Sequence, residues 1–240
     1  MGNYHATDIA MLARLPLQAR SNFSSAIRNE QPRAISVAES AAWRVFDLTI
    51  SLLILAFMLP FLAVLSVMVF VSDPGPVFYR HNRIGHRGRY FQCLKFRTMK
   101  LDGDAILAAH LKVSPAARTE WDATRKLRSD PRVTPLGAVM RKLSLDEFPQ
   151  LLNVLSGEMS LVGPRPIVEQ EVQKYGSYFE HYCRVRPGLT GIWQTSGRSD
   201  TSYQQRVTMD VAYVGRKSVA FDLWLMAKTL PAVLAAKGSY

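Results

Sequence analysis

The sequence predicts an α+β, mostly helical protein that is anchored in a membrane by a re-entrant helix-break-helix, with a cytosolic catalytic domain and amphipathic interfacial helices. One observation is an uncharged run of 24 residues at positions 48–71. A second is that strand patterns are confined to a short stretch after this run, while helical patterns dominate elsewhere. The third is charge: positions 80–142 hold 15 Lys and Arg against 5 Asp and Glu, in a chain of net charge +11.

The first 40 residues mix polar and small side chains without a sustained period, and we expect a mobile cytosolic arm over 1–40. Residues 41–73 are expected to form the re-entrant membrane helix, and residues 74–240 the cytosolic catalytic domain. A hydrophobic content of 48% excludes an intrinsically disordered chain. Two cysteines without a CxxC motif favour a reducing compartment.

The uncharged run would form a helix of about 36 Å, which is long enough to cross a bilayer. Arginines flank it on both sides, and Arg-rich flanks favour the cytoplasmic side of a membrane; they are Arg14, Arg20, Arg28, Arg33 and Arg44 before it, and Arg80, Arg83, Arg87 and Arg89 after it. One span cannot place both flanks in the cytoplasm, whereas a hairpin bent at Pro60 can. A simple span with a tolerated proline remains the alternative.

Two strands, 77–81 and 90–99, are predicted around a turn at Gly85–Gly88. Alternation along the second strand would place Lys95 and Arg97 on one face, as a phosphate-binding pair or as part of a solvated edge strand.

Helical composition follows in several segments, and the predicted helices are 103–128 (broken at Ser114-Pro115), 136–142, a helix opened by 144–147, 169–184, and an apolar helix over 219–236 that lies on the membrane. Residues 162–166 and 186–191 are predicted loops, and Gly197-Arg198 a turn.

Two adjacent acids, Asp146 and Glu147, stand within the basic part of the chain. Ser144 and Glu147 fit a capping box, which would make Glu147 a structural cap. Alternatively, Asp146 is a nucleophile toward phosphorus and the pair holds Mg²⁺, a cation that prefers carboxylate and phosphate oxygens.

Three arginines could converge on a diphosphate, because guanidinium groups bind phosphate through two parallel hydrogen bonds. They are Arg141, Arg165 in a rigid Gly-Pro-Arg-Pro segment, and Arg198 after a glycine. Each could equally be a surface side chain. The basic stretch suits anionic lipid headgroups or phosphorylated substrates, and no nucleic-acid-binding signature is present. A non-catalytic, membrane-anchored basic module that binds anionic lipid or polysaccharide is therefore the alternative to an enzyme.

Several motifs together resemble those of the bacterial sugar transferase family, the monotopic polyprenyl-phosphate hexose-1-phosphate transferases. They are KFRTM at 95–99, LSLDEFPQ at 143–150, LNVL at 152–155, GEMSLVGPRP at 157–166 and RPGLTG at 186–191. The resemblance covers about residues 41–240. The family breaks its re-entrant helix at a Ser-Pro pair, whereas this chain has Leu59-Pro60.

The resemblance implies an enzyme of exopolysaccharide biosynthesis at the cytoplasmic face of the bacterial inner membrane. Asp146 would attack the sugar-bearing phosphate of a UDP-hexose, release UMP, and pass the hexose phosphate to undecaprenyl phosphate. Glu147 would bind Mg²⁺ beside Asp146, and the phosphate-binding residues would be Lys95, Arg97, Arg141, Arg165 and Arg198. Galactose is the first expected hexose and glucose the second. Besides membrane lipids, the expected partners are downstream glycosyltransferases, with homo-oligomer formation left open.

Overall fold

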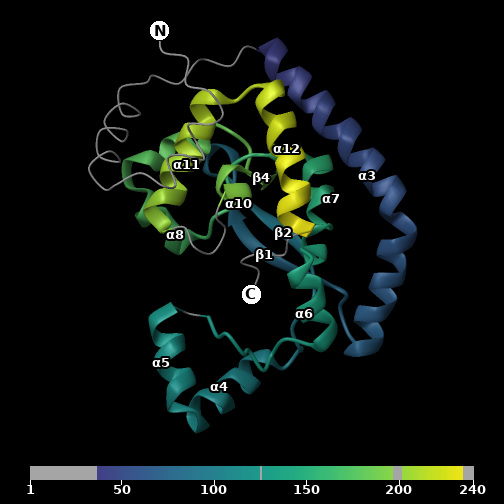
Figure 1. The fold of residues 1–240 in the computed structure, drawn as a ribbon, viewed down its shortest axis with the longest axis vertical. Helices are drawn as coiled ribbons and strands as arrows, with labels where there is room; N and C mark the ends of the chain where they lie inside the picture. Colours follow the sequence, from purple (N-terminus) through teal and green to yellow (C-terminus); the bar gives the residue numbers. More distant parts are fainter. Residues whose placement is uncertain (1–36, 125, 197–201, 235–240) are drawn as a thin grey trace.

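The protein is seen in a computed structural model that describes residues 37–124, 126–196 and 202–234. The predicted arm therefore lies outside the described residues except for its last four. The elements, in chain order, are α3 (Val37–Ser72), β1 (Phe78–Ile84), η1 (His86–Gly88), β2 (Tyr90–Phe96), α4 (Gly103–Val113), α5 (Pro115–Thr124), α6 (Pro135–Lys142), η2 (Leu145–Glu147), α7 (Gln150–Ser156), β3 (Ser160–Val162), α8 (Glu169–Tyr175), η3 (Gly176–Tyr178), α9 (Phe179–Cys183), β4 (Gly188–Thr190), α10 (Ile192–Ser196), α11 (Tyr203–Arg216) and α12 (Val219–Leu234). Figure 1 shows α3 along one side of the molecule, next to α7 and α12.

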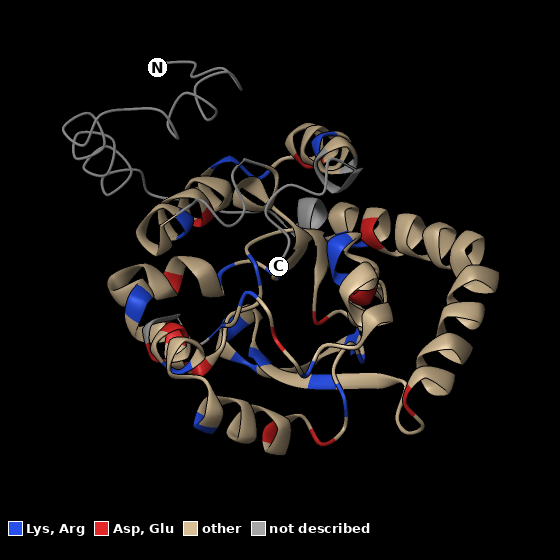
Figure 2. Cartoon of the chain, turned by 60° about the horizontal axis from the view of Figure 1, so that its bottom comes forward, with Lys and Arg blue, Asp and Glu red and all other residues tan. Residues whose placement is uncertain are grey.

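Helix α3 contains the uncharged run, and it is the one described helix that is long and apolar enough to cross a membrane. It is a single helix of 36 residues with Pro60 inside it, so the interruption expected from the sequence is not present. The helix instead curves strongly, as Figure 2 shows. A proline inside a helix removes one backbone hydrogen bond and favours such a bend.

Both halves of α3 pack against the same globular body. In the first half, Arg44 donates to the carbonyl oxygens of Val154 and Leu155 at 2.5 and 2.7 Å. Asp47 accepts from the Ser160 hydroxyl and the Leu161 amide at 2.8 and 3.0 Å. In the second half, the buried side chains are Leu65 and Val69, which join a core cluster with Phe96 and Met140. Between positions 52 and 64 no side chain of α3 is buried.

Two small sheets organise the centre of the molecule. Strands β1 and β2 form the predicted antiparallel hairpin, with Arg83 opposite Phe91 and Tyr79 opposite Lys95. Strands β3 and β4 pair in parallel, and the sequence prediction of loops at 162–166 and 186–191 missed this pairing. Three-residue strands of this kind are too short to show a periodicity in the sequence.

The predicted helices over 103–128 and 136–142 are confirmed in their main parts, including the break at Ser114. The single helix predicted over 169–184 is wrong. It is divided into α8 and α9 at Gly176, whose φ of 52° ends α8. Helices α10 and α11 were not predicted. A capping box formed by Ser202 and Gln205 begins α11, and this pattern was visible in the sequence.

The main core cluster lies between β2, α7, β3, α10, α11 and α12, and fully buried members include Leu151, Val154, Met159, Ile192 and Tyr213. Burial of these apolar side chains fixes α7 and α10 against the strands. The ends of β2, β3 and α7 therefore have defined positions, and the loops that leave them carry the site described next.

Candidate active site

Asp146 and Glu147 lie in the 3-10 turn η2, between α6 and α7. Ser144 adopts the left-handed backbone conformation, with φ 57°, and its side chain caps nothing. The capping-box interpretation of Ser144 and Glu147 is therefore wrong. The turn instead directs both carboxylates toward β2, where the Lys95 Nζ lies 2.6 Å from the Glu147 Oε1 and 3.5 Å from the Asp146 Oδ2.

The two carboxylates differ in their protonation behaviour. Burial raises the pKa of Asp146, and the negative charge of Glu147 adds to this, against the attraction of Lys95 and Arg141. Burial also opposes ionisation of Glu147, but Lys95 and Arg165 outweigh it and lower the pKa of Glu147 to about 2. Glu147 is thus a permanent anion, while Asp146 is a buried carboxylate whose charge is only partly compensated.

Arg165 is held at the pocket by close backbone packing of two loops. A side chain at Gly163 would place its Cβ 2.5 Å from the Arg186 carbonyl oxygen and 2.7 Å from the Gly188 nitrogen. The Gly163 amide donates to the Thr190 carbonyl oxygen at 2.9 Å, and the Gly188 amide donates to the Pro164 carbonyl oxygen at 2.8 Å. The close backbone approach that Gly163 and Gly188 allow therefore fixes the position of Arg165. Its Nη1 lies 3.9 Å from the Glu147 Oε1, and its guanidinium lies over the ring of Trp193.

The structure places the other predicted arginines differently. Arg141 ends α6, and its Nε donates to the Thr98 hydroxyl at 2.9 Å. It lies close enough to Asp146 for the two charges to interact. Arg97 is not brought to the carboxylates. β2 ends at Phe96, and the buried Arg97 guanidinium forms an ion pair with Asp73 at 2.9 Å. Arg198 lies outside the described residues.

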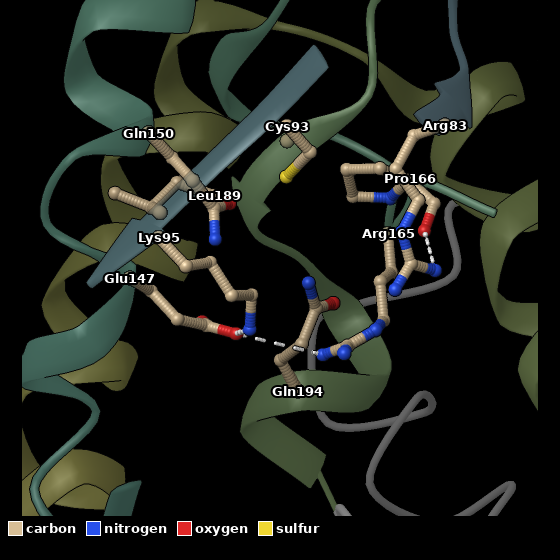
Figure 3. A pocket seen from close by; sticks show the side chains of 10 residues that line it. Arg83, Cys93, Lys95, Glu147, Gln150, Arg165, Pro166, Leu189 and Gln194 are labelled. Carbon is tan, nitrogen blue, oxygen red and sulfur yellow. Dashed lines mark hydrogen bonds and ion pairs between the residues drawn. The ribbon is translucent and has the colours of Figure 1, made fainter. Parts of the chain in front are cut away.

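Sequence reasoning missed several residues of the pocket around Lys95, Glu147 and Arg165, namely Arg83, Gln150 and Gln194. Figure 3 shows Glu147 and Lys95 on one side of the pocket, Arg83 on the other, and Arg165 reaching between them. Arg83 belonged to the basic stretch, but no motif separated it from its neighbours Arg80 and Arg87. Only the β1–β2 register brings it to the pocket.

The donor set at this pocket fits a Mg²⁺ ion that also binds substrate. Mg²⁺ is commonly held by one or two carboxylates together with phosphate oxygens, and retains waters. Asp146 and Glu147 supply two carboxylates, with the Lys95 ammonium between them. Within the described parts of the chain, no group of three or more His, Cys, Asp or Glu residues could hold a metal ion. The remaining ligands would therefore come from phosphate and water.

Comparisons with known proteins agree with the resemblance found in the motifs. The family model described as bacterial sugar transferase matches residues 38–236. The chain is 54% identical over 197 residues to the exopolysaccharide production protein ExoY of Sinorhizobium fredii, which covers 82% of this chain and 87% of that protein. It is 51% identical over 211 residues to ExoY of Rhizobium meliloti, covering 88% and 93%. It is 44% identical over 197 residues to the undecaprenyl-phosphate galactose phosphotransferase of Salmonella typhimurium, covering 82% of this chain and 41% of that protein.

Proposed function

Because this chain belongs to the bacterial sugar transferase family, we propose that it transfers hexose-1-phosphate from a UDP-hexose to undecaprenyl phosphate. Galactose is the first candidate hexose, since the relative from Salmonella typhimurium is named as a galactose phosphotransferase, and glucose is the second. The observation that carries the proposal is the buried Asp146 carboxylate, which lies 3.5 Å from the Lys95 ammonium. Lys95 and Glu147 line a pocket together with Arg165 and Arg83. The likeness to the two ExoY proteins supports a place in exopolysaccharide production.

The reaction proceeds in two displacements at one phosphorus atom. An oxygen of Asp146 attacks the sugar-bearing phosphorus of the donor, and the bond from that phosphorus to the bridging oxygen breaks. The electron pair leaves with UMP, and a hexose-phosphoryl-aspartate remains. A phosphate oxygen of undecaprenyl phosphate then attacks the same phosphorus, and the Asp146 carboxylate leaves and is restored. The product is undecaprenyl-diphosphate-hexose.

The basic side chains of the pocket position the donor and balance its charge. Phosphoryl transfer requires mainly alignment and electrostatic stabilisation from the protein. Lys95, which contacts both carboxylates, holds Asp146 toward the pocket and reduces its repulsion from the incoming phosphates. Arg165 reaches the Glu147 carboxylate from the opposite loop. Mg²⁺, held by Asp146 and Glu147, would supply further neutralisation of the diphosphate when bound.

The packing of α3 supports a re-entrant anchor on the cytoplasmic face. Its two halves contact one globular body, through Arg44 and Asp47 at one end and Leu65 and Val69 at the other. A straight span would carry one of these ends to the far side of the bilayer. Exposed apolar side chains occur along α3 from Val45 to Val71, and the most exposed of them, Phe57 at 78%, lies near the middle of the helix. This arrangement would insert the middle of α3 into one leaflet and keep Asp146 within reach of a lipid phosphate.

The covalent intermediate is tested by intact-protein mass spectrometry. The full chain, in detergent with Mg²⁺ and UDP-galactose but without acceptor, is expected to gain the mass of one hexose phosphate and to release UMP. UDP-glucose in a parallel sample identifies the preferred hexose. Asp146→Asn is expected to give no adduct, because an amide is a poor nucleophile toward phosphorus, whereas Asp122→Asn on the exposed face of α5 serves as the matched control.

Three other results would contradict parts of this proposal. Release of UMP only when undecaprenyl phosphate is present, without any adduct, would indicate direct transfer between the two substrates and a different role for Asp146. Neither adduct nor UMP under either condition would favour a non-catalytic basic module. Adduct formation in excess EDTA at the rate seen with Mg²⁺ would exclude the metal role given to Asp146 and Glu147.

A further inference from the structure

Arg83 is the one pocket arginine that no sequence motif singled out. It lies near the end of β1, paired with Phe91 of β2. One of its guanidinium nitrogens, Nη1, donates to the Pro166 carbonyl oxygen at 3.1 Å, in the same loop that carries Arg165. A guanidinium has five N–H donors, so this bond fixes the orientation of the group and leaves other donors for a ligand. Figure 3 shows Arg83 directed into the pocket on the side away from Glu147.

The surroundings of Arg83 are electropositive. Burial lowers the pKa of Arg83, and the neighbouring Arg165 charge lowers it further. The carboxylate whose charge opposes this lowering of the Arg83 pKa is that of Glu171. It accepts a hydrogen bond from the Val168 backbone amide at 3.0 Å, at the start of α8. Among the described residues no carboxylate forms an ion pair with Arg83. Arg83 has little charge compensation, and within the described chain Arg165 has an ion pair only with Glu147, at 3.9 Å. The two guanidinium groups therefore favour a bound anion, and phosphate matches their geometry.

The order of groups across the pocket indicates which phosphate Arg83 meets. Glu147 and Lys95 lie on one side of the pocket, and the Asp146 carboxylate lies 3.5 Å from the Lys95 ammonium. Arg165 lies 3.9 Å from Glu147, and Arg83 lies beyond Arg165. In a displacement at phosphorus the attacking and leaving oxygens stand roughly in line on opposite sides of that atom. A donor attacked by Asp146 would therefore direct its leaving group toward Arg83.

We propose that Arg83 binds the phosphate of the departing nucleoside monophosphate. This inference rests on the proposed function, and it assigns the two sides of the pocket different roles. Lys95 and Arg165 bind the phosphate that stays with the sugar, and Arg83 binds the phosphate that leaves with the nucleoside. When the bond to the bridging oxygen breaks, negative charge develops on the phosphate of UMP. The N–H groups of Arg83 stabilise that charge, in a geometry set beforehand by the bond to Pro166.

The experiment separates the two displacements in the full chain in detergent. We compare wild type with Arg83→Gln and Arg83→Lys, and use Arg80→Gln as the matched control, since Arg80 is exposed on the same strand. For Arg83→Gln we expect adduct formation from the UDP-hexose to slow by about 100-fold, the effect typical of removing one charge-stabilising donor. We also expect UMP to bind at least ~10-fold more weakly by calorimetry. Arg83→Lys should recover part of both losses and Arg80→Gln should lose neither.

Transfer from the preformed adduct to undecaprenyl phosphate gives a readout that a merely structural role would not reproduce. UMP has already left at that stage, so Arg83→Gln adduct accumulated by long incubation should transfer at the wild-type rate. Equal slowing of both half-reactions, or unchanged UMP affinity in both Arg83 variants, would overturn the inference. If wild type formed no adduct, the covalent route of the proposed function would fail, yet UMP titration of the same variants would still decide whether Arg83 binds a nucleotide phosphate.

Discussion

At the scale of single residues, the site depends on one ammonium group between two adjacent carboxylates. The Lys95 ammonium lies 2.6 Å from the Glu147 carboxylate and 3.5 Å from that of Asp146, so it stabilises the negative charge of Glu147 more strongly than that of Asp146. The pKa of Glu147 is lowered to about 2, whereas that of Asp146 is raised, because burial outweighs its more distant partners. Adjacent acids in the sequence thus acquire different properties, one as a permanent anion and the other as a carboxylate with reactivity that depends on pH.

The rate of adduct formation is therefore expected to rise with pH on the acidic side, because only ionised Asp146 attacks phosphorus. At the lowest Mg²⁺ concentration that supports adduct formation, its midpoint should lie above 3.8, the ordinary pKa of the group, since burial raises the pKa of Asp146 and bound Mg²⁺ opposes that rise. Single-turnover mass spectrometry across the pH range measures this midpoint. Glu147→Gln removes a neighbouring negative charge, so its residual rate should have a more acidic midpoint. A wild-type midpoint at or below 3.8 would contradict the assignment.

At the scale of secondary-structure elements, α11 is fixed against α8 by a buried acid. Asp210 is 3% exposed and accepts from the Tyr175 hydroxyl at 2.6 Å. Burial raises the pKa of Asp210 to about 7, against the stabilising effect of the Tyr175 hydrogen bond. The folded protein therefore binds a proton at Asp210 between pH 3.8 and about 7 that the unfolded chain does not hold.

Because the folded state binds the additional proton, the contribution of Asp210 to stability should be present below pH 3.8 and fall as the pH rises to about 7. The full change corresponds to roughly 4 kcal/mol. Asp210→Asn keeps an acceptor for Tyr175 without the charge, so its stability should depend less on pH and exceed that of wild type above pH 7. Thermal unfolding in detergent across this pH range measures the difference, with Asp122→Asn as an exposed control. An unchanged pH profile in Asp210→Asn would refute this account.

At the scale of the whole molecule, α3 is both the anchor and part of the globular body. Arg44 and Asp47 hold its first half to α7 and β3, while Leu65 and Val69 pack its second half near β2 and α6. Asp146 lies in η2, the turn after α6, so the proposed nucleophile is positioned by elements that pack on α3. Depth of α3 in the membrane would therefore determine how closely the pocket approaches lipid phosphates.

We expect both ends of α3 to face the cytoplasm. Ala41→Cys and Tyr79→Cys, each exposed and placed singly in a Cys183→Ser background, would report the two ends. The remaining Cys93 is buried. An impermeant maleimide added to intact cells should label neither position, and both should react once the membrane is opened. Labelling of either cysteine in intact cells would support a simple span and contradict the re-entrant anchor.

The sequence by itself was sufficient for the long apolar helix α3, the β1–β2 hairpin and the family, because each depends on local composition or on contiguous motifs. It did not show that Lys95 lies at the pocket while Arg97 pairs with Asp73 elsewhere, because alternation along a strand does not indicate where the strand ends. Neither did it reveal the parallel pairing of β3 and β4, or Arg83 in the pocket, which depend on contacts between segments far apart in the chain. Contiguous motifs in the sequence indicate which family the chain belongs to, whereas long-range packing decides which of its cationic side chains lie in one pocket.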